Sequence, residues 1–397
     1  MGCIFGKKPN PLKTDMSHFS LLRTIGKGGF GTVTAVVKES EPFKGKYFAI
    51  KKLAKSQLID SNSGIKVAWR ERNILQMIDS PFLPKLHWAF QDHACLYLVM
   101  DFLSGGDIGY LIKQRKRIEP DTARFYAGEI ALAMQELHRK KIVYRDLKPA
   151  NVLLDKRGHC RIIDFGIASF LDEKNGNKTL GDAGTPGYQS PEMCRGDQYQ
   201  FEPDFFAYGV TLYKMLSGHT PFEDNETMFK NNCEPKTWKY VPEQAQELIR
   251  MLLQPDPGKR LTDWNELQRH AFFKETNWGV LAKCDGDGPI IPDPDIANFP
   301  VECNAEALLL PETDNPVQDQ TIFAGYTYNS YSAATKNTAA QQPGKAVNQQ
   351  RQSSASQNPK TVAMMSPVPS SPAPSKPSQP SIPIESPPNN EVKSFPQ

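Results

Sequence analysis

The hydrophobic pattern of the chain changes at Gly105 and Gly106. After them, apolar residues recur at helical spacing, and Glu119-Pro120-Asp121 is typical of a helix start. Before them, one helix is predicted near residues 66–77. The pattern therefore predicts an α+β fold with a small β-rich lobe, a larger helical lobe and a ligand-binding cleft between them. Short apolar runs predict strands at residues 19–25, 32–37, 47–52, 86–90 and 96–100.

Composition limits the classes of function. A formal net charge of +3 over 397 residues gives no general attraction for nucleic acid, so we expect no nucleic-acid partner. The seven cysteines show no spacing typical of a zinc site or a disulfide framework, which indicates reduced thiols in a cytoplasmic protein. The sequence contains no apolar run of roughly 18 residues, so we expect no membrane-spanning helix.

Changes in composition divide the chain into four segments. Residues 1–18 form a short basic arm, and residues 19–273 carry the regular apolar pattern of a folded domain. Residues 274–328 are irregular but contain aromatic anchors, which indicates a segment wrapped on the domain. Residues 329–397 are rich in Pro, Ser and Gln, cannot bury enough surface to offset the entropy of ordering, and are expected to be disordered. The anchors of the wrapped segment are Trp278, Phe299, Phe323 and Tyr326.

Residues 26–31 form a glycine pattern that binds phosphates in several folds. In a dinucleotide-binding fold this pattern leads into a helix, whereas here it leads into the strand predicted at 32–37. The glycines therefore cap a β-hairpin whose backbone can lie over a polyphosphate without side-chain clashes. Taken alone, the motif could also be a flexible turn. The candidate phosphate-binding residues are Gly26, Lys27, Gly28, Gly29, Phe30 and Gly31.

The strand predicted at 47–52 places one ammonium group, that of Lys51, among apolar neighbours. A buried lysine needs a counter-charge, and Glu71 on the predicted helix is the natural partner. Such a pair would hold Lys51 on the α- and β-phosphates of a nucleotide. The alternative is a surface ion pair of little energetic value.

The most specific signal is the run Tyr-Arg-Asp-Leu-Lys-Pro-Ala-Asn at 144–151, followed by Asp-Phe-Gly at 164–166. A chance loop rarely combines these residue types in this order and spacing. Phosphoryl transfer needs little covalent help from a protein, because positioning and charge neutralisation supply most of the catalysis.

Four side chains in these runs match those requirements. Asp146 can accept the proton of a substrate hydroxyl, and Lys148 can neutralise the transferring group. Asn151 and Asp164 offer hard oxygen ligands to Mg²⁺. We therefore expect Asp146 and Lys148 to be catalytic and Asn151 and Asp164 to bind the metal.

With these motifs, residues 19–273 resemble the eukaryotic protein kinase family. Tyr144, which replaces the usual His, and the run Phe-Ala-Gly-Tyr-Thr-Tyr at 323–328 are similar to the AGC group. The runs at 289–292 and 296–299 resemble the Rho-associated and myotonic-dystrophy-type branch of that group. The resemblance implies a bilobal enzyme that uses ATP and Mg²⁺ to phosphorylate protein substrates.

The resemblance also implies roles for residues around ATP. Asp101 to Leu103 would form the hinge, Met100 would be the gatekeeper, and Asp107 would lie near the ribose. The adenine base would lie between Val33, Ala49 and Leu153.

Two further features follow from the resemblance. Lys148 and Thr185 match the serine/threonine pattern and not the tyrosine pattern. A stack of apolar side chains anchored by Asp204 would form the spine of an active kinase, although each could be ordinary core. The stack would contain Leu75, Leu86, Tyr144 and Phe165.

Two other functions are considered. A pseudokinase scaffold would bind nucleotide or partners without catalysis. Alternatively, the Pro-rich tail could be the main functional element, as a ligand for SH3 or WW domains or a target of proline-directed kinases. The complete set of catalytic residues argues against both as the main function. That set consists of Lys51, Glu71, Asp146, Asn151 and Asp164.

The first residues suggest lipid attachment. Gly2 and Cys3 offer an N-myristoylation site and an adjacent palmitoylation site, with Lys7 and Lys8 nearby. One acyl chain binds a membrane only marginally, so the second chain or the basic residues would be needed for stable anchoring. This predicts contact with the cytoplasmic face of a membrane; an unmodified arm is the alternative.

Two regulatory positions are also predicted. Phosphorylation of Thr327 would strengthen docking of the 323–328 run on the small lobe. In many AGC kinases a phosphothreonine stands where this chain has Gly181, so we expect activity without loop phosphorylation. Asp182 would supply a permanent negative charge to Arg145, whereas a phosphosite shifted to Thr179 is the alternative.

Substrate choice is predicted to differ from that of basic-directed AGC kinases. Ala150, Gly187 and Lys214 stand where such kinases place acids to receive substrate arginines, which leaves mainly Asp107. The pocket for the substrate residue that follows the phosphorylated residue would be polar, because it includes Asp182 and Gln189. We therefore expect a weak preference for upstream arginine and little demand for a large apolar residue downstream.

Overall fold

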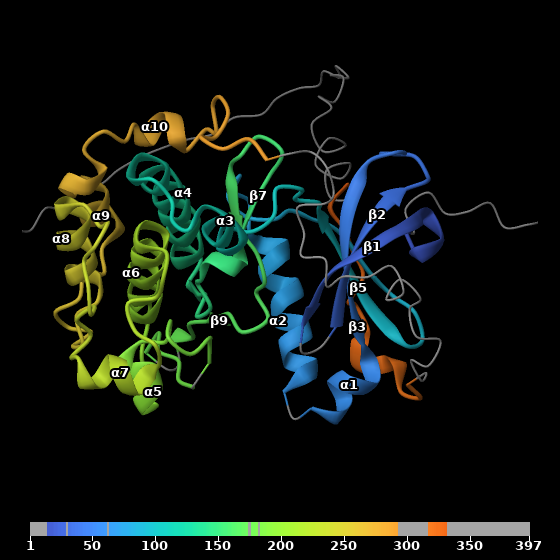
Figure 1. Ribbon diagram of the computed structural model, residues 1–397. Helices are drawn as coiled ribbons and strands as arrows, with labels where there is room; N and C mark the ends of the chain where they lie inside the picture. The colour runs from blue at the N-terminus through green and yellow to red at the C-terminus, as the bar shows by residue number, and fades with distance from the viewer. Residues whose placement is uncertain are drawn as a thin grey trace, which may run out of the picture. The chain divides into compact units, whose positions relative to one another are not determined.

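The computed structural model describes residues 14–28, 31–61, 63–173, 176–181, 183–292 and 317–331. An antiparallel six-stranded sheet has the strand order β1-β2-β3-β5-β4-β10 (Figure 1). The first five strands along the chain coincide with those predicted from the sequence. The bounds are Phe19–Gly28 (β1), Gly31–Lys38 (β2), Tyr47–Ala54 (β3), Leu86–Gln91 (β4), Cys95–Asp101 (β5) and Tyr328–Asn329 (β10).

Side chains along β3 alternate between the two faces of the sheet. Phe48 and Ile50 belong to a buried cluster on one face, whereas Ala49 and Lys51 line a cleft on the other. The register pairs Ala49 with Met100 of β5, which brings the predicted adenine and gatekeeper positions together. The buried members of the cluster are Phe19, Val36, Phe48, Ile50, Trp88, Phe90, Cys95, Tyr97 and Val99.

Helix α2 (Gly64–Met77) carries Glu71. Its buried residues include Ala68, Glu71, Ile74 and Leu75, which recur at helical spacing and form one face. A short helix, α1 (Lys55–Asp60), precedes it and was not predicted. Its brevity leaves too few residues for an apolar period to be visible.

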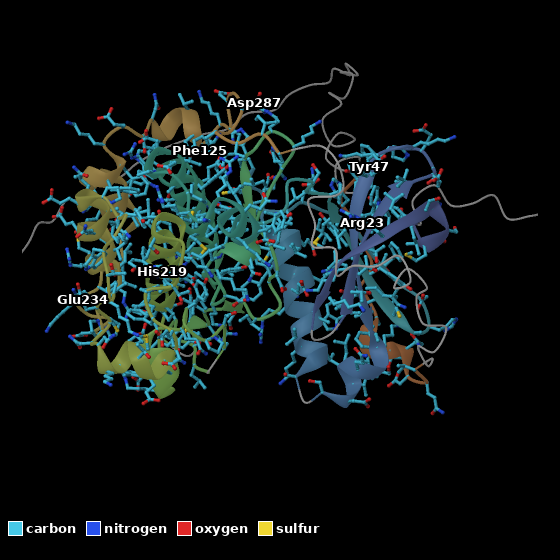
Figure 2. All side chains as sticks on the ribbon, viewed as in Figure 1. Arg23, Tyr47, Phe125, His219, Glu234 and Asp287 are labelled. Atoms are coloured by element: carbon cyan, nitrogen blue, oxygen red, sulfur yellow. The ribbon has the colours of Figure 1, made fainter. Side chains whose placement is uncertain are left out.

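The C-terminal part is mainly helical. Helix α4 (Pro120–Arg139) begins at the predicted Glu-Pro-Asp run and buries the predicted apolar stripe. Helix α6 (Glu202–Ser217) is buried along most of its length and packs against α4 and α8. Side chains fill the space between the helices of this part (Figure 2). The other helices are α3 (Ile108–Arg115), α5 (Pro191–Arg195), α7 (Asn225–Lys230), α8 (Glu243–Leu252), α9 (Trp264–Arg269) and α10 (Trp278–Leu281).

Short strand pairs frame the loop that carries the 144–151 run. This loop lies between β6 (Ile142–Val143) and β7 (Val152–Leu154), which pair with β9 (Ser169–Phe170) and β8 (Cys160–Ile162), respectively. The Asp204 side chain, buried at the start of α6, accepts hydrogen bonds from the backbone nitrogens of Tyr144 (2.8 Å) and Arg145 (2.7 Å). It therefore anchors the loop, as expected.

The segment after the domain returns to the sheet. Within it, β10 pairs with β4, with Tyr328 opposite Ala89 and Asn329 opposite Trp88. Asn329, which the sequence analysis assigned to the tail, thus lies in a strand, because its backbone completes a sheet ladder. The anchor Phe299 and the rest of the tail lie outside the described residues, apart from Ser330 and Tyr331. No helix in the described ranges is long and apolar enough to cross a membrane.

Candidate active site

The glycine-rich run forms the predicted hairpin. β1 and β2 are paired up to Gly28 and Gly31, and the run leads into a strand. Gly31 is required there, because a Cβ atom at this position would lie 1.9 Å from the Lys52 carbonyl oxygen. Gly29 and Phe30 lie outside the described residues.

Lys51 is the centre of an ionic cluster. Its Nζ lies 2.6 Å from Glu71 Oε1 and 3.2 Å from Asp164 Oδ1. Burial works against the charged form of Lys51, but the Glu71 and Asp164 charges reverse this effect and raise its pKa above the usual value. The predicted pair with Glu71 is therefore present, and Lys51 is protonated.

A cleft lies around this cluster. Most predicted nucleotide-binding residues line it, but Gly28 and Asp107 do not. The Asp107 carboxylate instead caps α3 by accepting a hydrogen bond from the backbone nitrogen of Tyr110 (2.8 Å). Ile25, Pro84 and Ile163 also line the cleft and were not predicted from the sequence. Its lining residues are Ile25, Gly26, Lys27, Gly31, Val33, Ala49, Lys51, Glu71, Leu75, Pro84, Met100, Asp101, Leu103, Leu153, Ile163, Asp164 and Phe165.

Asp146 lies in a compact polar network. Its Oδ2 accepts hydrogen bonds from Lys148 Nζ (2.9 Å) and Asn151 Nδ2 (2.8 Å). The Thr185 hydroxyl donates to Asp146 Oδ1 and accepts from Lys148 Nζ, both over 2.6 Å. The network thus joins three of the predicted residues and fixes the direction of the Asp146 carboxylate.

Asp164 lies at the mouth of the same cleft. Its backbone has a φ of 62°, and its Oδ1 accepts a hydrogen bond from the Gly166 nitrogen (3.2 Å). Burial opposes ionisation, but Lys51 outweighs it and lowers the pKa of Asp164. The side chain is 49% exposed, so an ionised carboxylate is accessible to a cation.

The predicted apolar spine is buried. The rings of Tyr144 and Phe165 meet edge to face with centroids 5.7 Å apart. Leu75 and Leu86 are each 2% exposed and belong to the same buried core. The Tyr144 hydroxyl also donates to the Ile163 carbonyl oxygen, a polar role that its apolar assignment did not predict.

Comparison with known proteins agrees with this geometry. Residues 19–273 match the family described as the protein kinase domain. The chain belongs to the protein kinase family.

Relatives of this kinase come from distant organisms. The RAC family serine/threonine-protein kinase homolog of Dictyostelium discoideum is 35% identical over 81% of this chain and 74% of its own length. Serine/threonine protein kinase ypkA of Aspergillus fumigatus is 36% identical over 79% of this chain and 51% of its own length. Protein kinase C delta type of Rattus norvegicus is 35% identical over 79% of this chain and 48% of its own length. These relatives indicate an AGC-like kinase, and this chain spans about half the length of several of them.

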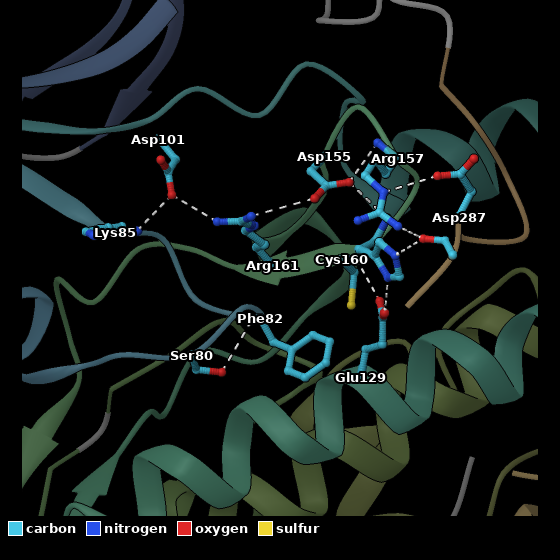
Figure 3. Close-up of polar contacts among 12 residues, drawn as sticks. Ser80, Phe82, Lys85, Asp101, Glu129, Asp155, Arg157, Cys160, Arg161 and Asp287 are labelled. Atoms are coloured by element: carbon cyan, nitrogen blue, oxygen red, sulfur yellow. Dashed lines mark hydrogen bonds and ion pairs between the residues drawn. The ribbon is translucent and has the colours of Figure 1, made fainter. Parts of the chain in front are cut away.

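The Asp101 carboxylate, at the end of β5, forms a polar bridge that the sequence did not reveal (Figure 3). The Asp101 carboxylate accepts hydrogen bonds from the Lys85 backbone nitrogen (3.2 Å) and Arg161 Nη1 (2.9 Å). His87 Nε2 lies 2.8 Å from the other Asp101 oxygen, and His87 Nδ1 lies 2.5 Å from the Tyr331 hydroxyl. The Asp101 side chain therefore links β5 to β8.

A second polar cluster lies away from the cleft (Figure 3). Among the described residues, Glu129, His159 and Cys284 are the group whose ligand atoms are close enough to hold a metal. However, His159 Nδ1 lies 2.5 Å from Glu129 Oε1, and His159 Nε2 lies 3.1 Å from the Gly286 carbonyl oxygen. Both ring nitrogens are thus engaged by protein oxygens, and the cluster joins the segment after the domain to α4.

Proposed function

We propose that the chain is an ATP-dependent kinase that transfers the γ-phosphate to serine or threonine hydroxyls of protein substrates. One observation carries the proposal: Lys51, Glu71 and Asp164 line one cleft, and the charge of Lys148, a member of the Asp146 network, acts on the Asp164 carboxylate. This arrangement pairs a phosphate-binding cation with a general base, as phosphoryl transfer requires.

The donor set fits ATP with Mg²⁺. Asp164 offers an ionised and accessible carboxylate. The Asn151 amide nitrogen donates to Asp146, so its oxygen is the atom that would serve a cation. When bound, ATP supplies the transferred phosphoryl group and Mg²⁺ neutralises its charge. Lys51 would hold the α- and β-phosphates, with the hairpin of Gly26 to Gly31 above them.

The remaining cleft residues would bind the base. Val33, Ala49 and Leu153 would present apolar surface to adenine, the backbone from Asp101 to Leu103 would supply the hinge, and Met100 would be the gatekeeper. Asp107 would lie near the ribose, and its carboxylate also caps α3 by accepting a hydrogen bond from the Tyr110 backbone nitrogen.

Asp146 and Lys148 would act on the substrate. The Asp146 carboxylate would orient the hydroxyl and accept its proton, while Lys148 would neutralise the transferring group. Thr185 bridges the two, which supports serine or threonine as the acceptor. The intact network also argues against a pseudokinase.

The test is turnover of ATP on a generic protein substrate by the full-length chain. Asp164→Ala should abolish Mg²⁺-dependent phosphorylation, because it removes a metal ligand and a partner of Lys51. The matched control is Asp60→Ala at the exposed end of α1, which should leave turnover unchanged. Equal turnover in wild type and Asp164→Ala, or turnover without Mg²⁺, would contradict the proposal.

The wider organisation is part of the proposal. We assign residues 19–273 to the catalytic domain, the following segment to an AGC-type extension and the Pro/Ser/Gln-rich tail to partner binding. The sequence runs at 289–292 and 296–299 support the Rho-associated and myotonic-dystrophy-type branch. SH3 or WW domains and proline-directed kinases are the partners that suit the tail composition.

We also propose a lipid-anchored arm and one regulatory phosphosite. Gly2 and Cys3, which would be acylated, lie outside the described residues, as does Asp182. Thr327 is exposed, and its carbonyl oxygen accepts a hydrogen bond from Arg72 Nη2 over 3.5 Å. This cation supports Thr327 as a site where a phosphate would be bound.

A further inference from the structure

Tyr199 connects the segment after β9 to the rest of the domain. It lies just before α6 and is 2% exposed. Its backbone pairs with that of Thr179 through hydrogen bonds of 2.9 and 3.0 Å in the two directions. Its ring packs in a buried cluster with Val143, Leu171 and Met193. Tyr199 is therefore a fixed point on which the segment can be held.

The Tyr199 hydroxyl makes two hydrogen bonds. It accepts one from Arg145 Nη1 (3.3 Å) and donates one to the Gly181 carbonyl oxygen (3.0 Å). A neutral phenol carries one proton and free lone pairs, so it can serve both partners at once. Burial raises the pKa of Tyr199 despite the Arg145 charge, which keeps the hydroxyl protonated.

Arg145 directly precedes Asp146 in the chain and is held in one position. Its backbone nitrogen donates to Asp204 Oδ1, and its Nε donates to the Ile167 carbonyl oxygen, both over 2.7 Å. Its φ of 72° is unfavourable for a residue with a side chain, so these contacts must maintain it. Any change at the Arg145 guanidinium is therefore transmitted to the adjacent Asp146.

The Arg145 guanidinium donates its hydrogen bonds to uncharged oxygens, those of the Ile167 carbonyl and the Tyr199 hydroxyl. Within the part of the chain that the structure describes, no carboxylate forms an ion pair with it. A second guanidinium, that of Arg70 on α2, donates to the Ala168 carbonyl oxygen (3.4 Å). Burial, and then the Arg145 charge, lower the pKa of Arg70, which shows that the two cations are close. Such a pair would normally attract an anion.

Gly181 cannot supply that anion. A Cβ atom at this position would lie 4.0 Å from Arg145 Nη1, so Gly181 is next to the cation. Glycine has no hydroxyl to phosphorylate, and its φ of 124° disfavours any other residue. Among the described residues of the loop, Gly181 contributes its carbonyl oxygen, which is linked to Arg145 through the Tyr199 hydroxyl.

We propose that Tyr199 is a positioning residue that orders this loop in place of a phosphate and acts through Arg145 on Asp146. The inference rests on the kinase activity proposed above and adds its regulation. Two permanent hydrogen bonds take the part that a phosphate would play between the loop and the arginine. The enzyme is therefore active without phosphorylation of the loop.

The test uses the full-length chain made in bacteria and treated with phosphatase until its intact mass shows no phosphate. The wild type should keep its kcat. Tyr199→Phe should lower kcat about tenfold with an unchanged KM for ATP, because only alignment is lost. The matched control is Tyr208→Phe, which removes a buried hydroxyl that donates to the Ala127 carbonyl oxygen (2.8 Å). It should destabilise the protein similarly and leave kcat unchanged.

Two further measurements separate this role from simple stability. In an Arg145→Gln background, Tyr199→Phe should cause no additional loss of kcat, because the two groups act through one contact. Hydrogen exchange of residues 176–181 should become faster in Tyr199→Phe and not in Tyr208→Phe. This second measurement does not depend on catalysis.

Several results would overturn the inference. The wild type could lose its activity on phosphatase treatment, or Tyr199→Phe could keep its full kcat. Hydrogen exchange of residues 176–181 could also be the same in Tyr199→Phe as in the wild type. Loss of kcat in Asp182→Ala together with full kcat in Tyr199→Phe would assign the role to Asp182 instead. The kinase function and the ordering of the loop can fail separately. If the wild type never shows activity, the proposed kinase function is refuted. If hydrogen exchange of residues 176–181 is still faster in Tyr199→Phe, the ordering of the loop by Tyr199 is supported all the same.

Discussion

The ring of Tyr326 lies edge-on against the indole of Trp69, with centroids 5.3 Å apart. Trp69 is on α2, the helix that carries Glu71. Phe323 and Tyr326 are both 0% exposed, and the Gln91 side chain donates to the Phe323 carbonyl oxygen (2.8 Å). The segment after the domain therefore braces the helix on which the Lys51–Glu71 pair depends.

The first prediction concerns these two aromatic anchors. Replacing Phe323 and Tyr326 together with alanine should lower kcat, because α2 loses its support. It should also destabilise the protein by several kcal/mol, since truncating one buried aromatic costs about 3–5 kcal/mol. Steady-state kinetics and urea unfolding measure the two effects. Phe229→Ala on α7, where the side chain is 44% exposed, is the control and should change neither. Unchanged activity in the double variant would contradict the bracing role.

The second prediction concerns Thr327. A phosphate there would lie near Arg72, whose guanidinium carbon lies 5.7 Å from the centroid of the Tyr328 ring. Because the site is exposed, the added contact should stabilise docking by only about 0.5–1 kcal/mol. Phosphorylation of the wild type at Thr327 should therefore raise its melting temperature and its kcat. The difference should vanish in Arg72→Gln; persistence there would mean that Arg72 does not receive the phosphate.

The third prediction concerns peptide choice. Lys214 Nζ donates to the Tyr188 hydroxyl (3.0 Å), and Asn225 Nδ2 donates to Gln189 Oε1 (2.9 Å), so the predicted substrate positions carry a cation and polar groups. We expect a peptide array to show weak selection for upstream arginine and little for a large apolar residue downstream. Lys214→Glu should raise kcat/KM for arginine-containing peptides. An array dominated by Arg-x-x-Ser followed by Phe or Leu would refute this.

The fourth prediction concerns the polar bridge between Asp101 and Arg161. Arg161→Gln should lower the free energy of unfolding by about 1–2 kcal/mol at pH 7, because it leaves a largely buried carboxylate without its cation. Burial opposes ionisation, but His87 and then Arg161 lower the pKa of Asp101 in the folded state. The stabilisation of the folded state by the ionised Asp101 carboxylate is therefore present above the pKa of Asp101 in the unfolded chain. It is lost as pH falls through the lower pKa of Asp101 in the folded state.

Urea unfolding between pH 7 and about pH 2.5, a range that extends below the unfolded pKa of Asp101, measures the difference in unfolding free energy between wild type and Arg161→Gln. The gap between wild type and Arg161→Gln should be constant near neutrality and should narrow toward the acid end. Arg195→Gln breaks an exposed pair with Asp197 and should cost about 0–1 kcal/mol throughout. A gap that widens toward acid pH would show that Asp101 is not the partner that matters.

The fifth prediction concerns the N-terminal arm. Intact-mass measurement of protein from eukaryotic cells should show one myristoyl group on Gly2 and one palmitoyl group on Cys3. Gly2→Ala should remove the myristoyl group and release the protein from membranes, because the remaining basic residues bind too weakly alone. An unmodified N-terminus would contradict the prediction.

Much of the fold and the central site could be predicted because the signals are local. Five strands of the sheet follow from apolar runs bounded by turn residues, and α4 follows from its Pro-containing start and its stripe. The Lys51–Glu71 pair could be inferred because a buried ammonium needs a counter-charge, whatever the fold.

The rest depends on tertiary contacts that a linear pattern does not contain. The capping role of Asp107 depends on where α3 begins, which its sequence neighbours do not fix. Asp101 gains its role only because Arg161, distant in sequence, lies beside it. Tyr199 resembles any buried tyrosine until Arg145 and Gly181 are found at its hydroxyl.

The strand β10 has a consequence for solubility. It pairs with β4 at the end of the six-stranded sheet, so the part of the β4 edge at Trp88 and Ala89 is covered within the same chain. A chain truncated before residue 317 would expose this edge together with the ring-lined surface beneath it. Open edges of this kind recruit strands from neighbouring copies. Shortened versions of the protein should therefore self-associate at concentrations where the intact chain stays monodisperse, even if their catalytic residues are unchanged.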